Sequence, residues 1–315
     1  MAYRLKLGEA FGKGVRRVLR EQIDAVESAL GPSDDIDTGI HESRKSMKRA
    51  RAALALVRPV LDRRQYRRED ARYRDIGRLL SEARDARVML DTIGRLEERF
   101  PEAKDHPVLR RLAADRLARS LQHREDLDRR RLRQIRSELA AARRAIDDLS
   151  IEGKRLSIIL PGLEQTYAKA RKMAKRAERF DHAEDFHEWR KHVQRHWRHL
   201  VLLERAWSEI MIARAASARE LSDLLGWDHD LAMLAQAISA EAGVDGEAGV
   251  ALKLCDTLQH ELRARALPIG ARLFAERPEE LGQRVSVYWK ASRRLKRAAG
   301  SAQRAPANGA ATRGD

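Results

Sequence analysis

The stretch HESRKSMKRARAAL, residues 41–54, recurs as HEWRKHVQRHWRHL at residues 187–200, and this repetition decides how the chain is expected to fold. Each copy begins with a histidine and continues with closely spaced basic residues. The second histidine follows the first by 146 positions (187 − 41), close to half of the 315 residues. The identical positions are His41/His187, Glu42/Glu188, Arg44/Arg190, Lys45/Lys191, Arg49/Arg195 and Leu54/Leu200.

A second repeated element supports the same duplication. The stretch RDIGRLLSEARDARVML, which starts at Arg74, aligns with RELSDLLGWDHDLAMLA, which starts at Arg219, at an offset of 145 positions (219 − 74). Two independent pairs of segments, in the same order and at nearly one offset, indicate an internal repeat. The matched positions are Arg74/Arg219, Leu79/Leu224, Leu80/Leu225 and Asp85/Asp230.

The apolar residues keep a helical period. In the first copy Met47, Ala50, Leu54, Val57 and Leu61 follow one another at steps of three and four, which places them on one face of an α-helix. Alternating strand patterns are essentially absent. We therefore predict an all-α protein. The expected helices span about 3–30, 40–58, 63–98, 107–149, 160–180, 183–206, 208–240, 247–276 and 279–297.

The duplication also predicts how these helices are arranged. Short loops between long helices favour antiparallel neighbours, so each half is expected to form an antiparallel four-helix bundle, with the two bundles related by a pseudo-two-fold axis. We predict a first bundle at 1–150, a second bundle at 151–297 and a disordered low-complexity tail at 298–315.

The composition limits the kind of partner. Lysine and arginine outnumber aspartate and glutamate 64 to 48, which gives a net charge of +16 and favours polyanionic partners. The single cysteine, Cys255, excludes an internal disulfide framework and a cysteine-based zinc site. No uncharged apolar stretch approaches the roughly 20 residues that span a bilayer. We therefore expect a cytoplasmic protein with no membrane partner.

Each histidine-led helix is predicted to carry a row of cations opposite its apolar stripe. On a helical wheel His41, Lys45 and Lys48 lie on this face in the first copy, and the second copy repeats the arrangement. Glu42 and Glu188 are expected to lie off the axis of the row, so that they do not neutralise it. Like charges one turn apart repel, and a linear chain of phosphates would supply the missing negative charge. The remaining members of the two rows and their shoulders are Arg44, Arg49, His187, Arg190, Lys191, Gln194, Arg195 and Arg198.

These motifs resemble the CHAD family, the conserved-histidine α-helical domain. The resemblance rests on H-x-x-R-K-x-x-K-R-x-R at residues 41–51, on H-x-x-R-K at 187–191, and on the leucine-rich elements RLLSEARDARV (78–88) and LLGWDHDLAM (224–233). It covers the chain from about Tyr3 to Arg294. It implies two four-helix bundles with pseudo-two-fold symmetry and the binding of inorganic polyphosphate in a basic central groove. It also implies an association with polyphosphate granules and with polyphosphate-metabolising proteins.

Transferred residue by residue, the resemblance implies a polyphosphate site with contributions from both repeats. Gln194 stands where the first copy has Lys48, and Trp197 stands where it has Arg51, so we expect the second copy to bind less strongly along that row. Arg74, Arg78 and Arg219 are further candidates for the lining. The implied binding residues are His41, Arg44, Lys45, Lys48, Arg49 and Arg51 in the first copy, and His187, Arg190, Lys191, Arg195 and Arg198 in the second.

Three other functions compete with this prediction. His192, His196 and His199 lie on one helix flank at a workable zinc spacing, but they have no counterpart in the first copy, and H-E-x-x-H is absent. Phosphoryl transfer is disfavoured because the chain has no P-loop, so we expect neither catalysis nor a cofactor. Nucleic-acid binding or a scaffold role is the main alternative. Aromatic residues make up only 5%, which gives little support to a stacking platform for single strands.

Overall fold

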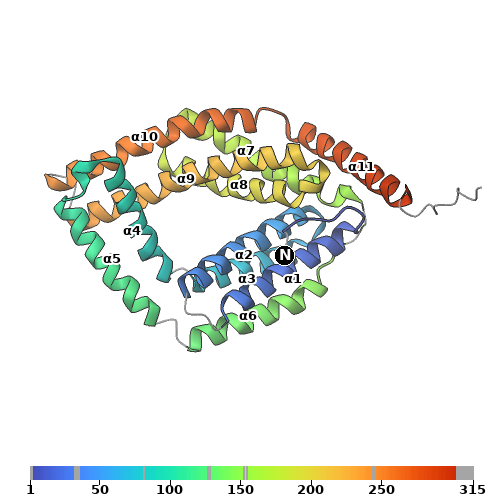
Figure 1. The fold of residues 1–315 in the computed structure, drawn as a ribbon, viewed down its shortest axis with the longest axis horizontal. Coiled ribbons are helices and arrows are strands. Elements are labelled where there is room, and N and C mark those ends of the chain that lie inside the picture. The colour runs from blue at the N-terminus through green and yellow to red at the C-terminus, as the bar shows by residue number, and fades with distance from the viewer. Residues whose placement is uncertain are drawn as a thin grey trace, which may run out of the picture.

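The computed structural model describes residues 3–31, 36–80, 82–125, 129–151, 153, 155–242 and 246–302. Throughout these ranges the regular secondary structure is helical, with no strand, which confirms the all-α prediction (Figure 1). The 3-10 helices are η1 (Arg58–Val60), η2 (Pro101–Ala103), η3 (Leu156–Ile158) and η4 (Glu204–Ala206). The α-helices are α1 (Phe11–Ala29), α2 (Ile36–Leu56), α3 (Arg63–Leu79), α4 (Glu82–Arg99), α5 (Pro107–Glu125), α6 (Arg129–Asp147), α7 (Leu160–Phe180), α8 (Ala183–Leu202), α9 (Ser208–Ala242), α10 (Glu247–Leu273) and α11 (Pro278–Ala302).

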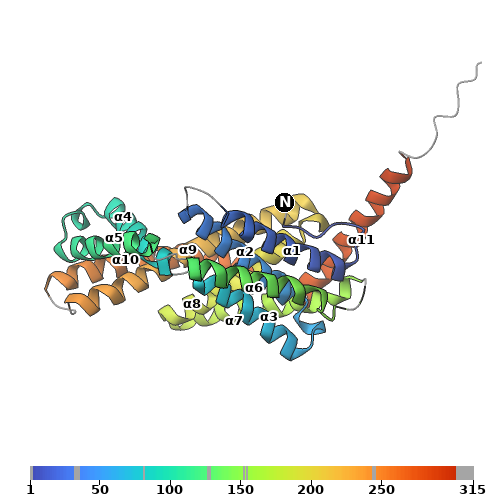
Figure 2. The same cartoon turned by 90° about the horizontal axis from the view of Figure 1, so that it is seen from below.

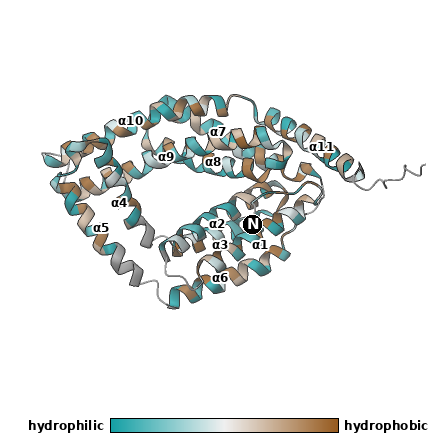
Figure 3. Ribbon diagram, viewed as in Figure 1, coloured by the Kyte–Doolittle hydropathy of each residue, from teal (hydrophilic) through white to brown (hydrophobic). Residues whose placement is uncertain are grey.

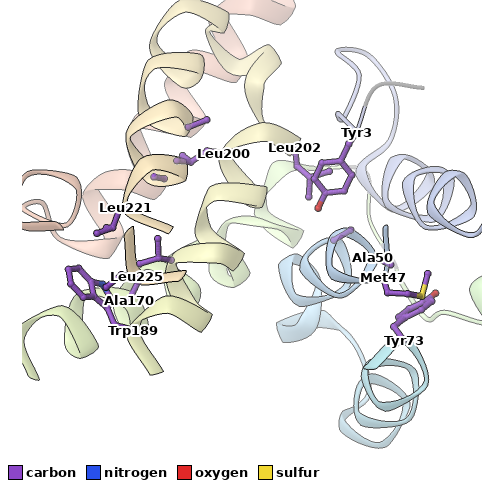
Figure 4. Packing of buried hydrophobic residues seen from close by; sticks show 14 of the residues in the cluster. Tyr3, Met47, Ala50, Tyr73, Ala170, Trp189, Leu200, Leu202, Leu221 and Leu225 are labelled. Carbon is purple, nitrogen blue, oxygen red and sulfur yellow. The ribbon is translucent and has the colours of Figure 1, made fainter. Parts of the chain in front are cut away.

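Four helices of the first half, α1, α2, α3 and α6, pack into one bundle. Met47 and Ala50 of α2 are fully buried and face Tyr73 of α3 (Figure 4). The other faces of these helices are hydrophilic, as the alternating colours along each ribbon show (Figure 3). The bundle therefore forms because each helix has one apolar face to bury.

The second half is built from α7, α8, α9 and α10, with α11 packed against α7. Its core contains Trp189 of α8 and Leu221 and Leu225 of α9, all fully buried (Figure 4). Gly270 of α10 lies directly over the Trp189 ring, where an added Cβ would come within 2.3 Å of the indole. A large side chain on α8 thus fills the space that a glycine leaves on α10.

The α4–α5 hairpin leaves the first bundle and packs against α9 and α10 instead (Figures 1 and 2). Arg99 at the end of α4 donates to Glu261 of α10, at 2.7 Å. The range 1–150, predicted as one bundle, therefore sends two of its helices to the far end of the second half. The pseudo-two-fold duplication itself stays a prediction.

The N-terminal residues form an extended strap, whereas we expected a helix from about residue 3. The Tyr3 hydroxyl donates to the Arg49 carbonyl of α2, and the Leu5 N–H donates to the Leu202 carbonyl of α8, both at 2.9 Å. Tyr3 and Leu202 accordingly lie together between the two halves (Figure 4). Gly8, at a φ of 96°, turns the chain before α1 begins. The prediction was wrong because Tyr3 and Leu5 bond to α2 and α8 rather than to a helical turn of their own.

Several predicted helices differ in extent. The expected helices at 63–98 and 107–149 are each two helices, α3 with α4 and α5 with α6. Pro268 lies inside α10, which corresponds to the expected helix at 247–276. Helix α11 continues to Ala302, so the first residues of the expected tail, 298–302, are helical. Residues 303–315 lie outside the described residues.

The two halves meet where α2 crosses α7 and α8. Nε2 of the buried His199 on α8 lies 2.8 Å from the Ala52 carbonyl of α2, and because a carbonyl only accepts, this nitrogen donates. Gly162 of α7 approaches the Leu56 carbonyl so closely that an added Cβ would lie 2.0 Å from it. These small contacts hold the two histidine-led helices side by side.

Candidate functional site

A cavity of about 490 Å³ lies between the two histidine-led helices and is closed on a third side by α3. We call it the basic groove. Its lining includes eight lysines and arginines, one histidine, one glutamine and one alanine; among the described residues it includes no carboxylate and no phenylalanine, tyrosine or tryptophan ring. The lining residues are Lys48, Arg51 and Ala52 of α2, Arg74 and Arg78 of α3, and His187, Arg190, Lys191, Gln194, Arg195 and Arg198 of α8.

Local structure fixes the three helices that carry these side chains. The Asp62 carboxylate caps α3 by accepting from the N–H groups of Arg64 and Gln65, both at 2.9 Å. The buried apolar face of α2 packs on α1 and α3, and that of α8 packs on α7 and α9. Because each helix buries its apolar face in its own bundle, the polar faces of α2 and α8 turn toward the space between the bundles.

Some of the cations already have carboxylate partners outside the lining. Arg51 donates two hydrogen bonds to Asp70, at 2.9 and 3.0 Å. Arg74 pairs with Asp75 at 3.0 Å. Among the described residues, by contrast, no ion pair joins Lys48 or Arg195 to a carboxylate. The groove therefore keeps an excess of positive charge despite these pairs.

Glu42 and Glu188, which follow the two leading histidines, each form an ion pair with a lysine of the row, contrary to our expectation. Glu42 accepts from Lys45 at 2.8 Å, and Glu188 accepts from Lys191 in the same way one helical turn along α8. Our prediction that both acids lie off the row was wrong. A glutamate and a lysine three residues apart are neighbours on the helix surface, and flexible side chains close the remaining distance.

Lys48 lies where the positive potential of the groove is concentrated. The residue is exposed and lines the groove. Burial, together with the charges of Arg198, Arg190 and Arg44, lowers its pKa to about 8, and Asp230 offsets only part of this effect. An ammonium whose proton is disfavoured by neighbouring cations is stabilised when an anion arrives.

The pKa values of two arginines of α8, Arg198 and Arg195, are also lowered. Burial and the charges of Arg49, Arg195 and Arg190 lower the pKa of Arg198 to about 10. Arg198 is only 8% exposed, and its guanidinium donates to the Gln194 carbonyl at 2.7 Å and lies 4.9 Å from the Trp197 ring. The pKa of Arg195 is also lowered by burial. Desolvated cations attract phosphate more strongly than solvated ones, because less water screens them.

A second histidine adjoins the groove, and sequence reasoning missed it. The ring of His229 on α9 lies 4.0 Å from the ring of His187, with the planes inclined by 31°. Burial lowers the pKa of both imidazoles, that of His229 to about 4, and Arg190 and Lys191 contribute in both cases. His229 falls within the leucine-rich element LLGWDHDLAM (224–233), which we used only for the repeat and the family resemblance.

Nine of the fourteen predicted binding residues line the groove, and five lie elsewhere. Arg44 is in an adjoining hollow of about 160 Å³ that also includes Lys48, Arg51, Arg74 and Arg78. The five residues outside the groove are His41, Arg44, Lys45, Arg49 and Arg219.

The four remaining predicted residues outside the groove, apart from Arg44, have different surroundings. His41 lines a separate hollow of mixed charge with Arg87, Asp37 and Asp91. Lys45 pairs with Glu42. Arg49 lies over the Tyr3 ring at 5.7 Å. Arg219 lies 5.9 Å from the Trp197 ring and 3.7 Å from Asp223.

The three histidines considered for zinc have structural surroundings. His196 packs between the rings of Tyr167 and Phe274, at 5.3 and 5.6 Å, and His199 bonds to Ala52. Burial lowers the pKa of His192 to about 4. Among the described residues no group of three or more histidine, cysteine, aspartate or glutamate side chains is arranged to hold a metal ion.

Comparisons with known proteins agree with this architecture. The family model of the CHAD domain matches residues 9–239, and the chain belongs to that family. The crystal structure of the CHAD domain from the plant Ricinus communis is similar in fold, with a TM-score of 0.58 and 16% sequence identity, over 87% of this chain and 95% of that chain. None of the curated proteins compared matches the chain. No helix in the described ranges is long and apolar enough to cross a membrane.

Proposed function

We propose that this protein binds inorganic polyphosphate in the basic groove. The observation that carries the proposal is the lining itself: cations from α2, α3 and α8 converge on one cavity with no carboxylate among the lining side chains. Arginine binds phosphate oxygens bidentately, and lysine adds a mobile point charge. A ligand with one charge per repeating unit and no bases would satisfy this lining along its whole length.

The lining favours polyphosphate over nucleic acid. Single-stranded nucleic acids gain much of their binding energy from bases stacked on aromatic side chains, and among the described residues the lining contains no phenylalanine, tyrosine or tryptophan ring. Trp189 is fully buried in the core, and Trp197 is covered by arginines. Binding of nucleic acid, or a scaffold role on the same surface, remains the competing function, because charge alone attracts both ligands.

We further propose that binding proceeds without catalysis. Enzymatic phosphoryl transfer uses carboxylates to hold Mg²⁺ or to orient a nucleophile, and the groove presents cations where such groups would be required. A binding role fits association with polyphosphate granules and with polyphosphate-metabolising proteins. Both associations belong to the proposal.

A competition titration at near-physiological salt tests the proposal. Long-chain polyphosphate, duplex DNA and single-stranded RNA, matched in total phosphate, compete for the protein. We expect polyphosphate to bind more tightly than either nucleic acid by about two orders of magnitude, because it alone places charge along a narrow groove without bases to accommodate. Equal competition by all three polyanions would show that the net charge of +16 attracts any polyanion and does not select polyphosphate.

Variants connect the result to the groove. Replacing Lys48, Arg190 and Arg195 together with alanine removes three cations from the lining. A control of equal charge replaces Lys290, Arg293 and Arg294 of α11, which lie outside the groove. We expect only the groove variant to lose binding and to lose polyphosphate protection against thermal unfolding, with unchanged helicity by circular dichroism. Equal losses in both variants would contradict the assignment of the site.

A further inference from the structure

Two imidazole rings from different helices meet at the edge of the basic groove. His187 of α8 lines the cavity, and His229 of α9 covers its ring at a centroid distance of 4.0 Å. Both side chains are half-buried. In addition Nδ1 of His187 is buried, and among the described residues it has no hydrogen-bond partner. A titratable ring that is enclosed in this way, at the edge of a cationic site, responds strongly to a bound anion.

Building on the proposed function, we infer that His187 and His229 act as one proton-accepting pair that strengthens polyanion binding as the pH falls. The two rings lie face to face, so a positive charge on one imidazole is stabilised by the π-system of the other. Two imidazolium ions 4.0 Å apart would repel, which limits the pair to one proton. His229 is therefore a positioning residue that acts through His187.

The charges that face the pair explain why it is neutral in the free protein. On α8, Arg190 and Lys191 disfavour the proton, whereas Glu184 and Glu188 favour it more weakly at His187. On α9, His229 experiences Arg190, Lys191 and His187, all of which disfavour its proton. Burial is the largest effect at both rings. Both Arg190 and Lys191 line the groove, so a bound polyanion neutralises the groups that keep the proton off.

The direction of the pH dependence follows from this arrangement. A polyanion on Arg190 and Lys191 raises the pKa of the pair, so the complex binds a proton that the free protein does not. The affinity therefore increases as the pH falls below about 6.5, by at most about tenfold per pH unit for one proton. It stops increasing where the free pair itself becomes protonated. At about pH 8 this pair contributes no pH dependence.

Isothermal titration calorimetry with long-chain polyphosphate measures the proton directly. Titrations at about pH 6, in buffers with different ionisation enthalpies, report the protons taken up on binding. Lys48, whose pKa is about 8, is already protonated at that pH and does not contribute. We expect the wild-type protein to take up about one proton or somewhat less, and the His187→Gln/His229→Gln double variant to take up almost none.

A matched control uses a third histidine on the same helix. His192 is half-buried and has a similarly lowered pKa, but it does not line the groove, so His192→Gln is expected to keep the full proton uptake. The single variant His229→Gln should gain less affinity for polyphosphate on acidification from about pH 8 to about pH 6 than the wild type does. Binding without proton uptake in the wild type, or full uptake in the double variant, overturns the inference alone. Absence of polyphosphate binding at every pH overturns the proposed function as well.

Discussion

Helices α2 and α8 carry the same motif, but they contribute differently to the molecule. In both, a histidine and a glutamate are followed by a lysine that pairs with that glutamate. Of the residues that line the groove, α2 supplies two cations, Lys48 and Arg51, whereas α8 supplies four cations and one histidine. The second copy thus supplies more of the lining cations, whereas the expectation that it binds less strongly along its row stays a prediction. Matched sequence patterns therefore do not imply matched roles.

The difference arises from what each helix buries. Where the helices cross, α2 presents the small residue Ala52 to His199, whereas α8 buries the polar side chains of Arg198 and His199. Small residues allow close approach but add no charge. The helix that carries polar groups into the interface also brings its arginines to the cavity, where solvent is partly excluded. One helix thus provides the close contact, and the other provides most of the charge.

The largest expected difference between the two helices appears in acid. His196 and His199 are fully buried, and burial lowers their pKa values, that of His199 to about 3. The unfolded chain binds protons at both near pH 6.5, whereas the folded chain does not. Stability is therefore fully present above about pH 6.5 and is lost as the pH falls toward the folded-state values. We expect protonation of these two residues in the unfolded chain to lower the free energy of unfolding by about 3 kcal/mol between pH 6.5 and 5, measured by urea unfolding.

A variant of His196 separates this effect from general acid denaturation. Both ring nitrogens of His196 are buried and, among the described residues, lack hydrogen-bond partners. His196→Phe keeps a ring between Tyr167 and Phe274 and removes a group that only the unfolded chain protonates. It should reduce the acid-induced loss by about half and raise stability at neutral pH by about 1 kcal/mol. An unchanged pH dependence would show that other groups cause the loss.

The next largest effect concerns the α8 side of the groove. We expect Arg190→Ala with Arg195→Ala to weaken polyphosphate binding by about 100-fold, equivalent to about 2.7 kcal/mol. The slope of log affinity against log salt should fall by about 0.7 for each phosphate that the variant no longer neutralises. The α11 variant Arg293→Ala with Arg294→Ala removes the same charge outside the groove and should change affinity less than threefold, or about 0.7 kcal/mol.

A third prediction tests the close contact between α2 and α7, where the two halves meet. Gly162→Ala places a Cβ against the Leu56 carbonyl and should lower the free energy of unfolding by about 2 kcal/mol. Gly94→Ala in α4 is the control, because a Cβ there meets nothing within 4 Å. Alanine has the higher helix propensity, so this variant should be as stable as wild type or up to about 1 kcal/mol more stable. Equal behaviour of the two variants in urea unfolding would argue against a tight α2–α7 crossing.

The smallest effect distinguishes two faces of α2. Lys48→Ala with Arg51→Ala removes the two cations that α2 contributes to the groove, and we expect affinity for polyphosphate to fall about tenfold, or about 1.4 kcal/mol. Lys45→Ala with Arg49→Ala removes equal charge from the same helix outside the groove and should lower affinity less than threefold. If the α2 pair costs more than the α8 pair, α2 and not α8 is the principal contact.

Much of this molecule could be predicted from the sequence. Helical period and the scarcity of strand patterns predicted the all-α class, and the repeated motifs in the two halves of the chain were sufficient to identify the family. Nine residues predicted to bind polyphosphate do converge on one cavity. The residues converge because the polar face of an amphipathic helix can be predicted from residue spacing alone, whereas their binding of polyphosphate stays a prediction.

The sequence by itself determined the helices, their polar and apolar faces and the strongly basic character of the chain, because these depend on residue type and local spacing. Only the tertiary structure decided which cations share a cavity. Lys48 of α2 and Arg195 of α8 both line the groove, whereas Lys45 and Arg49 do not. His229 contacts His187 from a third helix, α9. These outcomes depend on how α2, α8 and α9 cross, and a crossing is set by long-range packing that no local pattern contains.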